Sequence, residues 1–252
     1  MISQNTFKSD NAYVNRVSNI NINLMNILDE KINFILNHRA TNHPFLINYA
    51  QSGLDKEESK VLYLETLHYF KYLPFYVCNI STLTRDEMVL RSIVFNASDE
   101  LGKTKSHSEM YQEFLLDKNL SSKEIDDYKC LPSTQALNDG IYNLYNTPPL
   151  QKALGALFAD ETMSASMVSK FNEGLIKEGL TEKQRKFWIL HIHVEVGHSN
   201  AIFNIVEKHL QTEEDQKKFM EGIEQYLHLM EMFWDGVSSK INNSKMVKHE
   251  SI

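Results

Sequence analysis

Residues 187–199, with the sequence FWILHIHVEVGHS, combine histidine and glutamate with apolar residues. His191, Glu195 and His198 lie four and then three positions apart, which places all three on one side of an α-helix. A buried carboxylate between imidazoles is costly unless a cation holds the charges together, and iron, zinc and manganese accept both ligand types. The spacing therefore predicts a metal site, the alternative being ordinary polar positions on a partly exposed helix. His193 points elsewhere on this helix and is interpreted as structural or as a support for the ligands.

Two further segments add acids and a histidine. Glu100 and His107 lie seven positions apart, about two helical turns, and therefore on one side of a helix. Glu161 lies in ALGALFADETMSASMV, the segment richest in apolar and small residues, where helices and a ligand can approach closely. Its neighbour Asp160 is expected to point to a different side. Together the segments offer three carboxylates and three histidines. The three carboxylates would offset most of the charge of two ferrous ions, and six ligands would leave open positions for dioxygen.

The order Glu-x6-His, a lone Glu, and His-x3-(Asp/Glu)-x2-His resembles the haem-oxygenase-like di-iron oxidases and oxygenases. The resemblance covers most of the chain, from about His43 through the last helix. It implies a seven-helix fold, two Fe(II) ions and dioxygen as co-substrate, with manganese in place of one iron as an alternative. By motif match the iron ligands are Glu100, His107, Glu161, His191, Glu195 and His198. One departure is Glu195, because the family usually has Asp there; the longer side chain can still coordinate. Thiaminase-like enzymes and a cofactor-free quinone-forming oxidase share the fold but lack these six ligands.

Members of this family act on small metabolites. The resemblance implies a dioxygen-dependent oxidase or oxygenase acting on an amino acid or amine derivative, by N-oxygenation or oxidative C–C cleavage. Relatives that decarboxylate fatty acids are an alternative. Another branch makes p-aminobenzoate from its own tyrosines and lysine, but the corresponding positions here hold Leu46, Leu62 and Phe171. Read directly, the sequence therefore does not support that self-sacrificing activity. Tyr63 and Lys170 lie one residue away, and a shift of the alignment by one position keeps this activity as an alternative.

Two competing interpretations remain. A ferritin-like di-iron site would use two Glu-x-x-His pairs and two further glutamates, namely Glu30, Glu65, His68, Glu161, Glu195 and His198. It is less favoured because it leaves His191 and the Glu100/His107 pair unused and places Glu30 in a segment typical of a solvated turn. The second is a non-catalytic helical binding protein that uses the Met- and aromatic-rich stripe of residues 230–234, although such a stripe is more often core or a dimer contact.

The remaining sequence predicts an all-α, haem-oxygenase-like bundle of about seven or eight helices. The 252 residues include only 9 Gly and 5 Pro, fewer than β or α/β folds of this length usually need. The formal net charge is −7 without a basic cluster, which argues against nucleic-acid binding. We find no run that could span a membrane and no apolar core of a signal peptide. Cys78 and Cys130 match no metal or disulfide pattern, so a cytoplasmic protein is expected, with a small-molecule substrate and a homodimer as one option.

The expected organisation is an irregular segment over 1–18, a single helical domain over 19–241 and a frayed tail over 242–252. Asp55 is expected to cap a helix that runs to about Ile80 with a kink at Pro74. The next helix is expected to start at Thr84 and continue through Gly102, which should only loosen it locally, to about Leu116. Three further helices should start at Pro149, Thr181 and Thr212. The walls of the pocket are expected to include Phe158, Met163, Phe187 and aromatic residues from 64–76.

Overall fold

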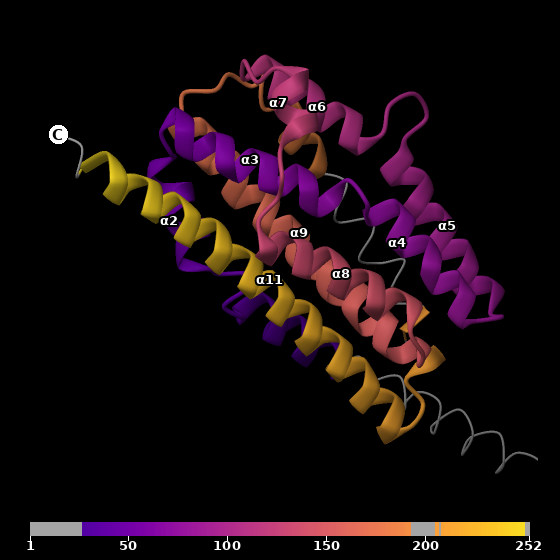
Figure 1. Ribbon diagram of the computed structural model, residues 1–252. Coiled ribbons are helices and arrows are strands. Elements are labelled where there is room, and N and C mark those ends of the chain that lie inside the picture. The colour runs from indigo at the N-terminus through magenta and orange to yellow at the C-terminus, as the bar shows by residue number, and fades with distance from the viewer. Residues whose placement is uncertain (1–26, 193–204, 207, 250–252) are drawn as a thin grey trace, which may run out of the picture.

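The computed structural model describes residues 27–192, 205–206 and 208–249 (Figure 1). These residues form helices, turns and loops without a β-strand, which confirms the all-α class for the described part. Residues 27–37 and 186–192 are helical. The other helices are α2 (Pro44–Ser52), α3 (Lys56–Phe70), α4 (Leu73–Asn79), the 3₁₀ helix η1 (Ile80–Leu83), α5 (Glu87–Leu101), α6 (His107–Asp117), α7 (Ser122–Asp127), α8 (Pro132–Asn146), α9 (Leu150–Lys177) and α11 (Glu213–His249). The predicted segment 1–18 and residues His193, Glu195 and His198 lie outside the described residues.

There are more helices than the seven or eight expected, because two long helices are interrupted. The helix capped by Asp55 ends at Phe70, and α4 starts at Leu73 with Pro74 in its first turn. Proline lacks an amide hydrogen and is tolerated at the start of a helix, so Pro74 begins a new helix where a kink was expected. The second interruption is at Gly102, which ends α5.

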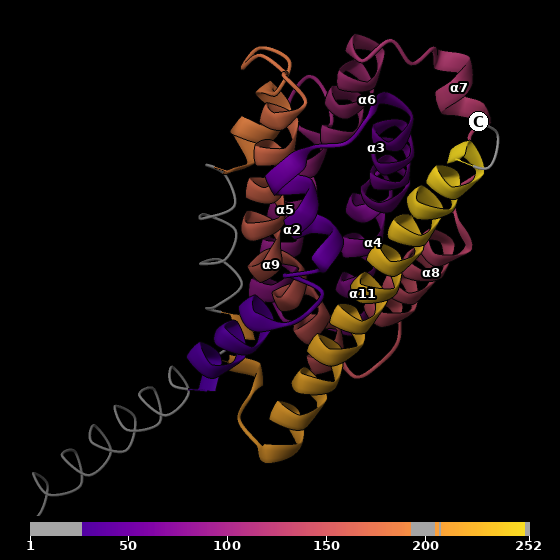
Figure 2. The same ribbon diagram turned by 90° about the vertical axis from the view of Figure 1, so that its left-hand side faces the viewer.

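Helix α9 occupies the centre of the bundle and packs against α2, α8 and α11 (Figures 1 and 2). Small residues allow α9 and α11 to approach closely. A Cβ atom on Gly155 would lie 2.0 Å from the backbone oxygen of Phe219, and one on Gly222 would lie 2.0 Å from that of Lys152. One continuous cluster of buried apolar side chains extends from Leu28 to Ile241. The small residues of α9 therefore permit the close helix packing that the sequence predicts.

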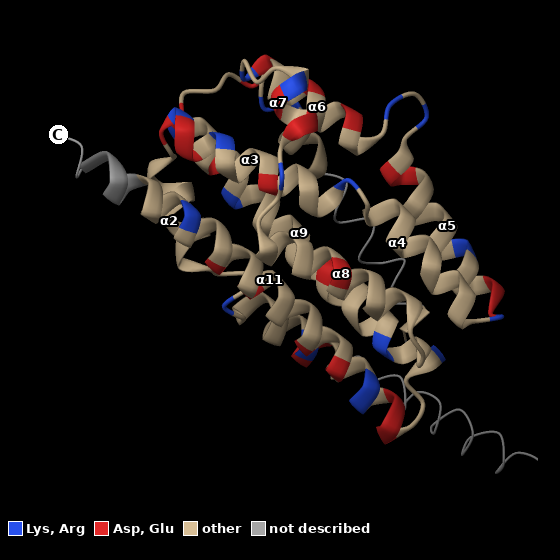
Figure 3. Ribbon diagram, viewed as in Figure 1, with Lys and Arg blue, Asp and Glu red and all other residues tan. Residues whose placement is uncertain are grey.

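Helix α11 is longer than expected, since it continues to His249 through most of the segment 242–252 that was expected to be a frayed tail. No Gly or Pro follows Gly236, so the chain has no strong helix breaker there. Figure 3 shows acidic and basic residues interspersed over the described helices. None of these helices has a stretch long and apolar enough to cross a membrane.

Candidate metal centre

A small cavity of about 90 Å³ lies among α3, α4, α5, α6, α9 and the helical segment 186–192. It is lined by Tyr69, Phe70, Leu73, Val77, Asn96, Glu100, His107, Asp160, Glu161, Ser164, Met167, Val168, Phe187 and His191. Three of these residues are carboxylic acids and two are histidines, and none of the described lining residues is Lys or Arg. Four of the six predicted ligands, Glu100, His107, Glu161 and His191, therefore meet at one cavity.

Glu100 and His107 are brought together by a loop and not by a continuous helix. Glu100 lies in the last turn of α5, and His107 is the first residue of α6. Gly102 separates the two helices with φ +59°, where a Cβ atom would lie 2.2 Å from the backbone oxygen of Lys105. Ser106 then caps α6 in a capping box with Glu109. The expected helix through Gly102 is therefore wrong, yet Nδ1 of His107 lies 3.1 Å from Oε2 of Glu100.

His191 is oriented by the backbone of its own helix. Its Nδ1 lies 2.7 Å from the carbonyl oxygen of Phe187, to which the ring N–H donates. The neutral ring then carries its lone pair on Nε2, which lies 3.1 Å from Nδ1 of His107. Burial, and next the proximity of His107, lower the pKa of His191. The neutral form is the one that binds a metal, and a backbone acceptor on the other nitrogen is typical of metal-binding histidines.

The two adjacent acids of α9 both line the cavity. Glu161 accepts a hydrogen bond from the side-chain amide of Asn96 on α5. Asp160 accepts hydrogen bonds from the hydroxyls of Tyr69 on α3, at 3.1 Å, and Tyr226 on α11, at 2.5 Å. Burial, followed by the negative charge of Glu161, raises the pKa of Asp160 to about 7. The expectation that Asp160 points away from the site is thus wrong, because the hydrogen bonds from Tyr69 and Tyr226 orient its carboxylate at the cavity.

This set of side chains fits a bound metal cation. Several carboxylates in one small cavity repel one another and lose hydration, and no lysine or arginine among the described lining residues compensates them. Carboxylate and imidazole together suit iron, and a di-iron centre in a helical bundle uses such residues. Within the described residues, however, no group of three or more His, Cys, Asp or Glu is arranged to hold a metal ion. His107 and His191 contact each other there, and the predicted ligands Glu195 and His198 lie outside those residues.

The side chains specific to the ferritin-like alternative do not come together at this cavity. Glu30 is exposed on residues 27–37. Glu65 is fully buried and accepts hydrogen bonds from Tyr128, the backbone amide of Leu131, and Thr134. His68 packs against the ring of Tyr128, with ring centroids 5.7 Å apart. The Glu65-x-x-His68 pair therefore faces the segment between α7 and α8, and that ligand set is not assembled.

The residues considered for p-aminobenzoate formation also lie away from the cavity. Leu46, Leu62 and Phe171 belong to the apolar core. The hydroxyl of Tyr63 donates to Glu178, and the Nζ of Lys170 donates to Ser166 at 2.6 Å. Neither Tyr63 nor Lys170 lines the cavity.

The cavity walls were only partly predicted. Phe187 and the aromatic residues Tyr69 and Phe70 line it as expected, whereas Phe158 and Met163 are buried in the core elsewhere. Met167, four residues after Met163 on α9, takes the expected place. The sequence analysis did not name Asn96, which also lines the cavity. Asn96 could have been found because it lies four residues before Glu100 and therefore on the same face of the helix.

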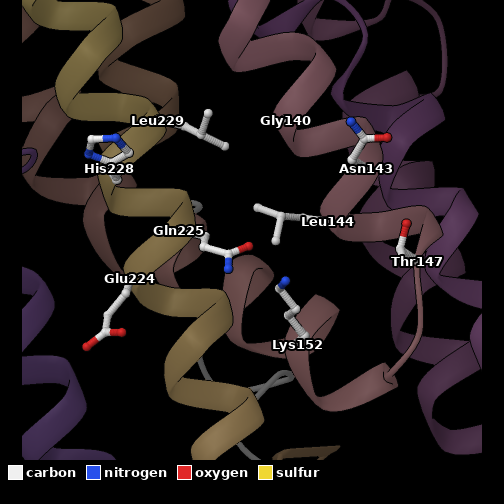
Figure 4. A pocket seen from close by; sticks show the side chains of 9 residues that line it. All are labelled: Gly140, Asn143, Leu144, Thr147, Lys152, Glu224, Gln225, His228 and Leu229. Carbon is white, nitrogen blue, oxygen red and sulfur yellow. The ribbon is translucent and has the colours of Figure 1, made fainter.

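A larger hollow of about 520 Å³ lies between α8 and α11 (Figure 4). It is lined by Gly140, Asn143, Leu144, Thr147, Lys152, Glu224, Gln225, His228 and Leu229. With one acid and one histidine beside a lysine, these side chains do not resemble a metal-binding or catalytic group. The smaller cavity around Glu100 and Glu161 is therefore the candidate centre.

In sequence, the chain resembles a known family of iron-containing enzymes. Residues 62–231 match a family described as iron-containing redox enzymes. The chain is 43% identical over 218 residues to 4-chloro-allylglycine synthase of Streptantibioticus cattleyicolor, covering 86% of this chain and 85% of that protein. It is 21% identical to 4-aminobenzoate synthase of Chlamydia pneumoniae, covering 87% of this chain and 95% of that protein.

The fold is also found among solved structures. A domain of unknown function with a haem-oxygenase-like fold from Shewanella denitrificans superposes with a TM-score of 0.73 at 20% identity, covering 89% of this chain and 94% of that one. The haem-oxygenase-like fold predicted from the sequence is thereby confirmed, and the ferritin-like architecture is excluded.

Proposed function

The chain belongs to the iron-containing redox enzyme family, and from that premise we propose that it is a non-haem di-iron enzyme that uses dioxygen to oxidise an amino acid or amino-acid derivative. The observation that carries the proposal is the composition of the cavity. Glutamates and histidines from four separate helical segments line it together, and the described lining residues include no lysine or arginine. Such a set attracts cations and holds them by oxygen and nitrogen ligands.

In this proposal the irons are held by Glu100, His107, Glu161, His191, Glu195 and His198. When bound, they would supply the redox chemistry with dioxygen. The protein prepares the ligands before the metal arrives. The carbonyl oxygen of Phe187 fixes the tautomer of His191, and the amide of Asn96 orients Glu161. Apolar side chains from α3, α4 and α9 keep the site dry, which strengthens electrostatic interactions within it.

The substrate class is supported by the relative of 43% identity. Its name describes the formation of an unsaturated, chlorinated amino acid. An amino-acid substrate oxidised at carbon, as in C–C cleavage, is therefore favoured over a fatty acid, with N-oxygenation of an amino group as the other reaction of this class. The 4-aminobenzoate synthases are more distant, and Tyr63 and Lys170 do not reach the cavity.

The test is dioxygen consumption by the ferrous-loaded protein. Amino acids, chlorinated amino acids and fatty acids of matched length are added one at a time, and products are identified by mass spectrometry. We expect one amino-acid class to accelerate oxygen consumption and to yield an oxidised product. Glu161→Ala should abolish the acceleration, while Glu173→Ala, an exposed position of the same helix, should retain it. Acceleration by fatty acids alone, or by nothing in an iron-loaded protein, would contradict the proposal.

A further inference from the structure

Asp160 lines the cavity but is not one of the six proposed iron ligands. Asp160 is buried between α3 and α11, and the hydroxyls of Tyr69 and Tyr226 both donate to its Oδ1. The two hydroxyl oxygens lie 2.8 Å from each other. Neither tyrosine contacts Oδ2, although Asp160 lines the cavity. The two tyrosines therefore fix the orientation of a carboxylate whose second oxygen remains for another partner.

The partners of Asp160 are neutral, unlike those of an acid in an ion pair. Tyrosine is uncharged at neutral pH, and Asp160 forms no ion pair with any described residue. The sequence from 193 to 204 contains no Lys or Arg. Glu100 and Glu161 have other contacts, with His107 and Asn96. Asp160 is thus a buried acid that this part of the chain does not neutralise.

The surroundings of Asp160 favour a particular shape of ligand. Phe70, Leu73, Val77, Met167 and Val168 give the cavity apolar walls. In a small cavity with such walls, the end of an aliphatic chain is favoured over the charged backbone groups of an amino acid, which the apolar side chains would desolvate. Apolar walls with one carboxylate suit an aliphatic chain that ends in an ammonium group, whereas a carboxylate end would be repelled and desolvated.

We propose that Asp160 binds the ammonium group of the substrate through Oδ2, so that the centre accepts cationic aliphatic amines and rejects alkanoates. Tyr69 and Tyr226 are positioning residues, because both hydroxyls hold Oδ1 and leave Oδ2 to the ammonium group. The oxidation of the bound amine rests on the function proposed above, whereas the binding of the ammonium group does not. For an amino acid, this subsite selects a side-chain amine and leaves the α-carboxylate outside the cavity.

The test measures binding to the full chain under argon, with and without ferrous ion, by isothermal titration calorimetry. The probes are n-butylammonium, n-butanol and butanoate at pH 8, which differ mainly in charge. Wild-type protein should bind n-butylammonium at least tenfold more tightly than the other two. Asp160→Asn should weaken n-butylammonium binding about ten- to a hundredfold and leave n-butanol binding unchanged, because a charge-assisted hydrogen bond is lost. The ferrous-loaded sample decides whether Asp160 is the amine-binding group. In that sample the irons would bind Glu100 and Glu161, so these two acids would not be available to the amine.

A matched pair of variants separates positioning from packing. Tyr226→Phe removes a hydroxyl that donates to Asp160 and should weaken n-butylammonium binding by a few-fold. Tyr145→Phe removes the hydroxyl of another fully buried tyrosine, one without a hydrogen-bond partner among the described residues, and should leave binding unchanged.

Iron content is counted in the same samples. Asp160→Asn should keep the wild-type iron stoichiometry; a joint loss of iron and amine binding would make Asp160 a metal ligand and overturn the proposal. Equal binding of the three probes by wild-type protein, or no n-butylammonium binding at millimolar concentration, would also overturn it. The wild-type protein could also bind the amine through Asp160 and yet take up no iron. That result would support the amine subsite and reject the proposed di-iron function, so failure of one proposal can be distinguished from failure of the other.

Discussion

Replacement of Glu65 by alanine should destabilise the fold without reducing iron binding. The Glu65 carboxylate is fully buried and connects α3 to the segment that joins α7 and α8. It accepts hydrogen bonds from the hydroxyl of Tyr128 at 2.5 Å and from the amide of Leu131 at 3.0 Å, and another from the hydroxyl of Thr134. In Glu65→Ala three donors lose their acceptor at once.

The expected size follows from those three donors. A buried donor without an acceptor costs about 1–3 kcal/mol, and Tyr128 is only half-buried, so the total should be about 3–5 kcal/mol. For a chain of this size each 1 kcal/mol shifts Tm by roughly 2–4 °C, which gives a fall of roughly 6–20 °C. Calorimetry measures Tm, and iron content is measured on the same preparations after ferrous loading.

Glu65→Gln serves as the control, because it keeps the volume and one oxygen acceptor and should lose less than half as much stability. Iron content should equal that of the wild type in both variants at a temperature where they are folded. A Glu65→Ala protein with unchanged Tm and lost iron would refute the reasoning, since it would return Glu65 to the ligand set of the ferritin-like alternative.

Three further outcomes are expected. Gly155→Ala should lower Tm, because its Cβ would lie 2.0 Å from the backbone oxygen of Phe219, and overpacking costs about 1–3 kcal/mol; an unchanged Tm would contradict the close approach of α9 and α11. Burial lowers the pKa of His68 to about 4, so between pH 6.5 and 4 the unfolded chain binds this proton and the folded chain does not. Stability to urea should therefore fall as the pH drops from 6.5 to 4, and His68→Gln should reduce that fall. An identical pH profile for His68→Gln and wild type would contradict this role of His68. Asn96→Leu should weaken iron binding about ten- to a hundredfold in a chelator competition, since Glu161 loses its orienting partner; unchanged affinity would remove that role.

Local signals allowed much of the fold to be predicted. Asp55 with Glu58, and Thr212 with Asp215, form caps between residues three positions apart, so sequence alone places the starts of α3 and α11. Gly102 shows the limit of such reasoning. Glu100 and His107 would lie near each other in one continuous helix with a loosened turn, and also in two helices joined by a loop. Only the backbone contact of Gly102 with Lys105 distinguishes these two structures.

The site depends more on packing between distant segments. Glu65-x-x-His68 matched a ligand pattern as well as Glu100 and His107 did, and what separates them is the tertiary contact of Glu65 with the segment before α8. Asp160 was expected to point elsewhere because adjacent helical positions differ by about 100°. Its orientation towards the cavity is set by Tyr226, a residue 66 positions away on another helix. Such contacts leave no periodic signal in the sequence.

The most direct test of the di-iron proposal is an anaerobic ferrous titration of the full chain, followed by mixing with oxygenated buffer in a stopped-flow spectrophotometer. We predict two irons per chain and a transient visible absorption band after mixing, both lost in Glu161→Ala while far-ultraviolet circular dichroism stays that of a folded helical protein. Substoichiometric iron in the wild type, no change in absorption with oxygen, or full iron loading of Glu161→Ala would contradict the proposal.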